Sequence, residues 1–222
     1  MSLSSILNTA RSGLLTAQRA VEVTSNNVAN AQTEGYSRQR VDTAAELPTR
    51  FVQGEFGAGV RITGTSRARD QFLDASFRRA SADASGGRVR SEALARMETI
   101  IGEPSDTGLS AALDAFYGAW SDFAARPSAS GVQGAVQESG AKVAQQLNRS
   151  AQRLDELQVE TRQRLESAVD EVNEIATAIA DLNQEIVAAE SGGQSANTLR
   201  DQRDLKLDRL VQLTGAEVLE SS

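Results

Sequence analysis

The sequence contains no cysteine and no histidine among its 222 residues, and aromatic side chains make up only 4% of it. Without cysteine there is no disulfide framework and no thiol nucleophile. Without histidine there is no classical zinc finger and no histidine-based catalytic triad or metal site. Any catalysis would have to use carboxylates, hydroxyl groups, lysine, arginine or tyrosine.

Long apolar runs and an excess of positive charge are absent as well. No stretch comes near 18 consecutive apolar residues, so we expect no insertion into a membrane. The first ten residues lack the basic start and apolar centre of a cleaved secretory signal. The chain is therefore expected to be either cytosolic or exported by a route that does not require such a signal. The formal net charge of −7 argues against nucleic acid as a partner, because general nucleic-acid binding needs a basic footprint.

Alanine, leucine, glutamine, glutamate and arginine are abundant, which is typical of helices that pack through small aliphatic seams. The length is about one and a half times that of a typical domain, which favours one elongated domain or a domain with an arm. We predict a mainly α fold. Long antiparallel helices should form an elongated rod-like bundle or coiled coil, with a small β-hairpin insert near residues 39–65.

Residues 1–30 carry the clearest periodicity. Apolar positions recur alternately four and three residues apart, which is the a/d pattern of a helix with one narrow apolar seam. Such a seam is costly to leave in water, so it needs a partner helix in this molecule or in another one. The pattern leaves open whether this is an ordinary core helix or an intermolecular coiled coil. The seam positions are Leu3, Leu7, Ala10, Leu14, Ala17, Val21, Thr24 and Val28.

The first helix is expected to end near residue 30, where asparagine and glycine permit the left-handed backbone conformations that close helices and form turns. A loop is predicted over residues 30–38. Between Gln39 and Thr65 the hydrophobic period changes to two, which predicts a hairpin or two short strands.

Helical periodicity dominates the rest of the chain. It predicts a helix over about 70–101, one that ends at Pro127, one over about 136–190, and a return helix that ends at Gly215. The apolar positions assigned to these four helices are Phe72, Leu73, Phe77, Ala80, Ala84, Val89, Leu94, Met97 and Ile101; Leu109, Leu113, Phe116, Trp120 and Phe123; Leu147, Ser150, Leu154, Leu157, Thr161, Leu165, Ala168, Val172, Ile175, Ile179, Leu182, Ile186 and Ala189; and Leu199, Leu207, Leu210 and Val211.

No arrangement of residues predicts catalysis. Residues 59–66 have the glycine spacing of a phosphate-binding loop, but Thr65 stands where the lysine that reaches the phosphates is required. Carboxylate pairs one helical turn apart, such as Asp170 with Glu174, are interpreted as a solvated helix face rather than a cation site. We therefore predict no enzyme, no cofactor and no metal.

The end of the first helix and the segment after it carry a recognisable motif. The motif positions are Asn26, Asn27, Asn30, Thr33, Gly35, Tyr36, Ser37, Arg38 and Gln39. Together with the a/d helix, this motif resembles the signature of bacterial flagellar axial proteins, which are the rod, hook and hook-associated subunits. The ending Tyr36–Gln39 is similar to the family of hook-associated protein 1, and residues 59–73, 102–120 and 199–204 agree with that family.

This resemblance implies a structural subunit that connects the hook to the filament. It also implies export through the flagellar type III apparatus with the help of a chaperone, and a place outside the cell at the distal end of the hook. The implied partners are copies of the same chain, the hook protein and the second junction protein on the filament side. Because members of the family are longer, we expect this chain to be an N-terminal fragment.

Two regions are expected within the chain. Residues 1–38 would form an assembly helix and a joint that are mobile in the monomer, and residues 39–222 would form the elongated helical domain. Our hypothesis is that residues 26–39 are the joint that sets the arm against this domain, the alternative being a plain loop that ends the helix. The proposed polymerisation seam consists of Leu3, Leu7, Leu14, Val21 and Val28.

Two other functions have to be weighed. A cytosolic coiled-coil scaffold or adaptor would show the same seams and the same acidity, and another flagellar rod or hook subunit would share the N-terminal motif. An adaptor has no need of the asparagine-rich joint, which favours the flagellar interpretation.

Overall fold

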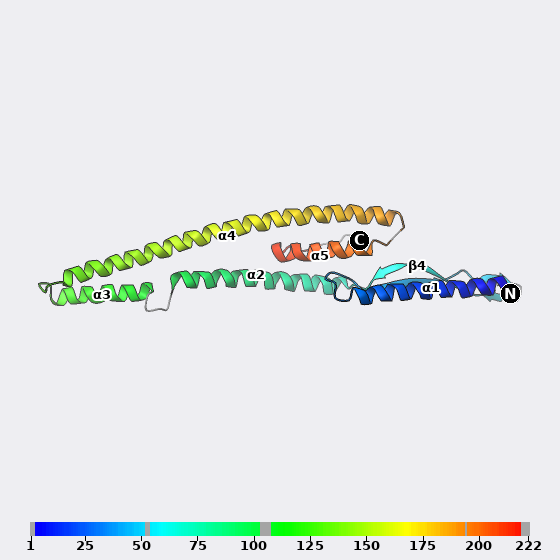
Figure 1. Cartoon of the computed structure of the whole chain (residues 1–222), viewed down its shortest axis with the longest axis horizontal. Coiled ribbons are helices and arrows are strands. Elements are labelled where there is room, and N and C mark those ends of the chain that lie inside the picture. Colours follow the sequence, from blue (N-terminus) through cyan, green and yellow to red (C-terminus); the bar gives the residue numbers. More distant parts are fainter. Residues whose placement is uncertain (1–2, 52–53, 103–107, 194, 219–222) are drawn as a thin grey trace. The chain divides into compact units, whose positions relative to one another are not determined.

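The structure is a computed structural model of the whole chain, and it describes residues 3–51, 54–102, 108–193 and 195–218. Helices dominate these residues, so the prediction of a mainly α fold is confirmed. None of the described helices combines the length and the apolar character that a membrane span needs. The elements are α1 (Leu3–Ala29), β1 (Gln39–Ala45), β2 (Thr49–Phe51), β3 (Gly54–Phe56), β4 (Val60–Arg67), α2 (Gln71–Ile101), α3 (Leu109–Ala125), α4 (Val132–Ser191) and α5 (Asn197–Thr214) (Figure 1).

The chain divides into two compact units. Unit 1 consists of residues 1–82 and 172–222, and unit 2 consists of residues 83–171. Unit 1 therefore contains α1, the strands, α5, the start of α2 and the end of α4. Unit 2 contains α3 with the remaining parts of α2 and α4. The boundary that we expected at residue 38 is not one of these divisions, and it stays a prediction.

The strands form two antiparallel pairs within one hairpin. β1 pairs with β4 from Gln39 opposite Arg67 to Ala45 opposite Val60, with a bulge between Asp42 and Thr43. β2 pairs with β3, and both lie in sequence between β1 and β4. The predicted hairpin is confirmed. The pair β1 and β4 is called the ribbon below.

Helix α1 contacts the ribbon with a mainly polar face. The Ser12 hydroxyl accepts a hydrogen bond from the Val60 amide at 3.2 Å and donates one to the Thr9 carbonyl at 2.8 Å. Hydrogen bonds thus help to attach this helix to β4, and the apolar seam is left for other contacts. The half-buried residues of α1 are Ser5, Ser12, Thr16, Val23 and Asn27.

The apolar core of unit 1 is supplied by the C-terminal half of α4 and by α5 with the residue before it. Ile175 and Ile186 on α4, Ala196, and Val211 on α5 are all buried. The part of the predicted α4 seam from Val172 to Ala189 is confirmed, because all six of its positions are buried or half-buried. As predicted, α5 ends at Gly215, whose φ of 68° lies in the left-handed region.

In unit 2 the aromatic face of α3 packs against the start of α4. A Cβ placed on Gly140 of α4 would lie 3.3 Å from the Phe116 ring, so the two helices approach closely at this point. The rings of Trp120 and Phe123 stack with their centroids 5.6 Å apart. The predicted α3 face is largely confirmed, although Trp120 remains 48% exposed. Residues 103–107, which precede α3 in the stretch that resembles the flagellar family, lie outside the described residues.

Two predicted apolar faces are not covered in the described part of the chain. On α2 the large apolar residues of the predicted face are exposed, Phe72 by 88% and Phe77 by 59%, and the buried residue of the helix is Arg78. On α4, Leu147 and Leu165 are also exposed. Periodicity places apolar residues on one face of a helix, but burial requires a second element against that face. A helix of 60 residues is about 90 Å long, whereas the 17 residues of α3 extend about 26 Å and cover only part of it.

Gly59 tests how the ribbon meets α1. Its φ is +114°, and a Cβ there would overlap the Ser12 hydroxyl. We expect Gly59→Ala to destabilise the chain by about 1–3 kcal/mol, because the new side chain strains the backbone and displaces Ser12. The measurement is thermal unfolding together with amide exchange at Val60. Gly57→Ala is the matched control, since a Cβ at Gly57 meets nothing within 4 Å. Equal effects of the two substitutions would contradict this account.

Candidate functional site

All five residues of the hypothesised polymerisation seam lie on the exposed side of α1. Their exposed fractions are 74% for Leu3, 61% for Leu7, 71% for Leu14, 65% for Val21 and 72% for Val28. The polar face of the same helix is the one that meets the ribbon. The seam is therefore accessible to another molecule or to another segment. Whether it polymerises stays a prediction.

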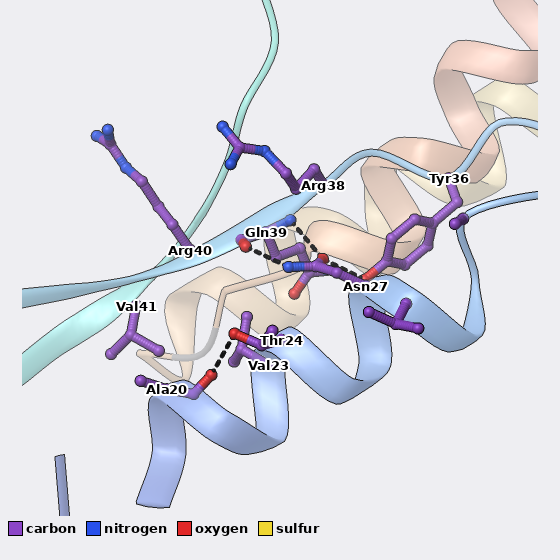
Figure 2. A pocket seen from close by; sticks show the side chains of 11 residues that line it. Ala20, Val23, Thr24, Asn27, Tyr36, Arg38, Gln39, Arg40 and Val41 are labelled. Atoms are coloured by element: carbon purple, nitrogen blue, oxygen red, sulfur yellow. Dashed lines mark hydrogen bonds between the residues drawn. The ribbon is translucent and has the colours of Figure 1, made fainter. Parts of the chain in front are cut away.

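The joint is built around the side chain of Asn27. Its amide nitrogen donates to the Gln39 carbonyl and its oxygen accepts from the Gln39 amide, both at 2.8 Å. The Tyr36 hydroxyl donates to the same oxygen at 2.9 Å (Figure 2). One side chain of α1 thus pairs with the backbone of β1 much as a neighbouring strand would. Asn27 fixes the end of α1 to the start of the ribbon.

The other asparagines form the turn between α1 and the ribbon. Asn30 donates to the Asn26 carbonyl at 3.0 Å and to its side-chain oxygen at 2.6 Å, and it accepts from the Thr33 hydroxyl at 3.2 Å. Gly35 has a φ of 77°, which a residue with a side chain rarely adopts. These residue types are therefore the ones that the turn geometry needs.

A groove of about 700 Å³ opens beside this joint. Val28 of the seam lines it, and Arg38 and Arg40 lie along its edge. Figure 2 shows both arginine side chains extending from the start of the ribbon away from α1. Among the other lining residues are Ala20, Val23, Thr24, Tyr36 and Val41.

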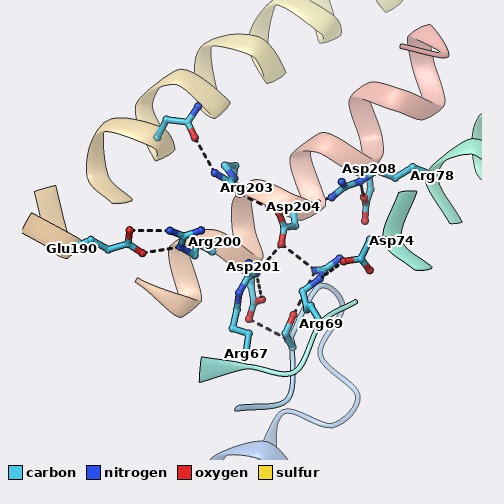
Figure 3. A network of polar contacts seen from close by, with 12 residues as sticks. Arg67, Arg69, Asp74, Arg78, Glu190, Arg200, Asp201, Arg203, Asp204 and Asp208 are labelled. Atoms are coloured by element: carbon cyan, nitrogen blue, oxygen red, sulfur yellow. Dashed lines mark hydrogen bonds and ion pairs between the residues drawn. The ribbon is translucent and has the colours of Figure 1, made fainter. Parts of the chain in front are cut away.

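Ser37 connects the joint to a network of charges on α5. The Ser37 residue is buried, and its amide donates to Asp201 Oδ2 at 3.1 Å. The other oxygen of Asp201 accepts from Arg67 at 2.8 Å. Arg67 also donates to Asp204 at 2.7 Å (Figure 3). The loop, the end of β4 and α5 are thereby joined through two carboxylates.

Asp204 lies at the centre of this network and is only 3% exposed. Besides Arg67, its carboxylate faces Arg69 at 3.2 Å, Arg78 at 3.8 Å and Arg203 at 3.7 Å. Arg78 also donates to Asp208 at 2.6 Å, and Arg69 donates to Asp74 at 2.8 Å. Four guanidinium groups therefore face four carboxylates, so the buried charges are balanced.

The pKa of Arg69 reflects this balance. Burial by itself lowers the pKa of the guanidinium, but the hydrogen bond to Asp74 and the charges of Asp74, Asp204 and Asp208 together outweigh it and raise the pKa. Most polar atoms of this network are paired, although Asp204 Oδ1 accepts no hydrogen bond within the described residues and has only the ion pairs with Arg78 and Arg203 at 3.8 and 3.7 Å. The described residues include no group of three acidic side chains placed to hold a metal ion. The arrangement serves to hold segments together.

Sequence reasoning did not find this network. The return helix was given an apolar face, but of Leu199, Leu207, Leu210 and Val211 the last alone is buried, the others being half-buried. The available signal was the spacing of Asp201, Asp204 and Asp208, which places three carboxylates on one helix face. The partners of those carboxylates lie about 130 residues earlier in the chain, where no local pattern could identify them.

Comparison with known proteins relates this sequence to a family. The family model described as "Flagellar hook-associated protein FlgK helical domain" matches residues 94–222. The chain belongs to this FlgK family. A second family model, "Flagella basal body rod protein", matches residues 7–36, which span most of α1 and the first part of the joint.

Curated relatives of the FlgK family match almost the whole chain. This chain is 32% identical over 219 residues to flagellar hook-associated protein 1 of Bacillus subtilis (strain 168). That match covers 96% of this chain and 43% of the relative. The proteins of the same name from Salmonella typhimurium (strain LT2) and Escherichia coli (strain K12) are 29% and 28% identical over 218 residues. Those matches cover 97% of this chain and 39% and 40% of the relatives, so the chain spans about two fifths of their length. No solved structure matches significantly.

Asn27 provides a test of the joint. We expect Asn27→Ala to destabilise the contact between α1 and β1 by about 1–3 kcal/mol, because it leaves the Gln39 amide and carbonyl without their partner. Amide exchange at Gln39 should become faster, and thermal unfolding should begin at a lower temperature. Asn8→Ala is the control, since Asn8 is an exposed asparagine of the same helix. Unchanged exchange at Gln39 would show that the pairing does not hold the joint.

The end of α4 provides a pH test. Arg200 binds Glu190 with two hydrogen bonds of 2.7 and 2.8 Å, and these bonds lower the pKa of the Glu190 carboxyl. The contribution of this pair to stability is present above the ordinary glutamate pKa and is lost as the pH falls through the lowered value. The groups are about one third exposed, so the contribution is expected to be below about 1 kcal/mol.

The pKa of Glu190 can be measured by NMR titration. Arg200→Gln should return it towards the ordinary range and remove this part of the acid dependence of unfolding. Lys206→Gln removes the same charge from an exposed position of the same helix and should leave Glu190 nearly unchanged. A titration of Glu190 that does not respond to Arg200→Gln would contradict the assignment.

Proposed function

We propose that this chain is part of a structural junction subunit that connects the flagellar hook to the filament, and that its role is not catalytic. Its partners would be copies of itself, the hook protein and the second junction protein on the filament side. Membership of the FlgK family and relatives named flagellar hook-associated protein 1 support this proposal. Because the chain spans about two fifths of those relatives, the proposal concerns the part that residues 1–222 contribute.

The observation that carries the proposal is the exposed seam of α1. Five large apolar residues with a/d spacing face away from the ribbon and are more than 60% exposed. Burying one such side chain fully contributes about 1.5–3 kcal/mol before the cost of ordering is subtracted. A seam of several such residues can therefore drive association, whereas a single residue cannot. This is the pattern expected of a helix whose partners are neighbouring subunits.

The proposal includes a route and a location. The subunit would leave the cell through the flagellar type III export apparatus, with a chaperone before export, and would reside at the distal end of the hook. The absence of cysteine and the low aromatic content are compatible with passage as an unfolded chain.

The seam can be tested in a motile host from which the native gene has been deleted. We expect the deletion to leave complete hooks without filaments, with flagellin shed into the medium, and a gene carrying Leu14→Asp not to restore filaments. The reason is that a carboxylate cannot be buried in the apolar seam without a large desolvation cost. Negative-stain electron microscopy and flagellin in the medium provide the measurement.

The control is Gln18→Asp, which places the same carboxylate on an exposed position of α1 outside the seam. This variant should restore filaments, and circular dichroism should show that residues 70–213 fold in both. Normal filaments after deletion would refute the junction role, and junctions formed by Leu14→Asp would refute the seam.

A further inference from the structure

The carboxylates on one face of α5 hold several segments from the first 82 residues. Asp201, Asp204 and Asp208 bind Arg67 at the end of β4, Arg69 just after it and Arg78 on α2. Among the three carboxylates, the contact of Asp201 with the joint stands out, because it reaches the backbone of Ser37 as well as a guanidinium group.

We propose that Asp201 is a positioning residue for the N-terminal arm. By holding Ser37 and Arg67 with its two carboxylate oxygens, it fixes the direction in which α1 leaves α5 and the start of α2.

The first step of the argument is where the two contacts lie. Ser37 comes two residues before β1, and Arg67 is the last residue of β4, where it pairs with Gln39 at the open end of the ribbon. One carboxylate therefore spans the base of both strands (Figure 3). A group that holds both strands at one end restricts the rotation of the whole ribbon, which a contact with one strand would not.

The second step is that α1 follows the ribbon. Asn27 pairs with the backbone of Gln39 at the base, and Ser12 binds the Val60 amide near the far end of β4. Two attachment points about four helical turns apart make α1 and the ribbon move together. Whatever orients the base of the ribbon consequently orients α1.

The third step is burial. Asp201 is 7% exposed and Ser37 is also 7% exposed, so water cannot readily replace either partner if the contact is lost. Gly35 lies against Leu205 of the same helix, where a Cβ would come within 3.4 Å of the Leu205 side chain. The joint is thus seated on α5 by a buried polar contact and by close packing.

The proposal concerns geometry, and only its consequence for assembly rests on the proposed function. If α1 is the assembly arm, its direction decides where its seam meets neighbouring subunits. Asp201 would then influence assembly although it lies outside the seam.

The test measures the arm directly in the purified chain. Because the sequence has no cysteine, spin labels can be attached at Gln18→Cys on α1 and Lys206→Cys on α5, both of which are exposed. Double electron–electron resonance then gives the distribution of distances between α1 and α5. We expect one narrow distance distribution for the labelled chain that retains Asp201, and a clearly broader or shifted distribution for the labelled chain with Asp201→Ala. Exchange of the Ser37 amide should also be about ten- to a hundredfold faster, as expected for the loss of a hydrogen bond to a charged group.

The matched control is Asp208→Ala, which removes a carboxylate of the same helix and the same network that binds Arg78 and not the joint. It should leave the distance distribution narrow. If Asp201→Ala fails to fold, Asp201→Asn is compared with Asp208→Asn, and faster Ser37 exchange is still expected for the former alone. A distribution as narrow in Asp201→Ala as in the native chain, or equal broadening in Asp208→Ala, would overturn the proposal. Neither result depends on assembly, so failure of the seam experiment leaves this measurement valid.

Discussion

The buried pairing of aspartates on α5 with arginines from the first 82 residues is the constraint on which unit 1 depends. Desolvating several charges is expensive, and such a cluster is tolerated only when every charge has close partners of the opposite sign. Asp204 meets this requirement with four guanidinium groups around one carboxylate. Removing Asp204, which all of these guanidinium groups share, would leave uncompensated buried charge, which typically costs about 3–5 kcal/mol. The segments are therefore held in one arrangement, because any other arrangement would leave a buried charge without a partner of opposite sign.

Polar residues of α1 and α2 lie on their packed faces. Arg78 of α2 turns towards α5, and Ser12 and Asn27 of α1 turn towards the ribbon. The apolar residues of both helices are consequently on the opposite, exposed faces. An ordinary amphipathic helix of a globular domain has the reverse orientation. Exposed apolar faces are unfavourable in an isolated molecule, which supports the proposal that these surfaces associate.

Sequence reasoning succeeded where the deciding physics is local. The positions of the helices, the hairpin and the end of α5 at Gly215 follow from periodicity and from residues that permit a left-handed backbone. The apolar seam of α4 from residue 172 onward was also predicted, because an element is present to cover it. The α2 helix was predicted, but the exposure of its apolar face was not, because periodicity identifies such a face without saying whether anything packs on it. The charge network could not be predicted for another reason. Asp201 and Arg67 are 134 residues apart, and in its local sequence each looks like an ordinary surface charge.

The ribbon changes the energetics expected for the arm. A mobile arm would have to lose the conformational freedom of nearly 30 residues when it assembles, at roughly 1–2 kcal/mol for each backbone fixed. Here Asn27 and Ser12 already attach α1 to the ribbon as a helix. Much of that ordering cost is then met by contacts within the chain, and burial of the seam has to offset only the remainder. In the proposed assembly the polar face would supply the order and the apolar face the attraction, so the contacts at the joint would influence how strongly an otherwise unchanged seam associates.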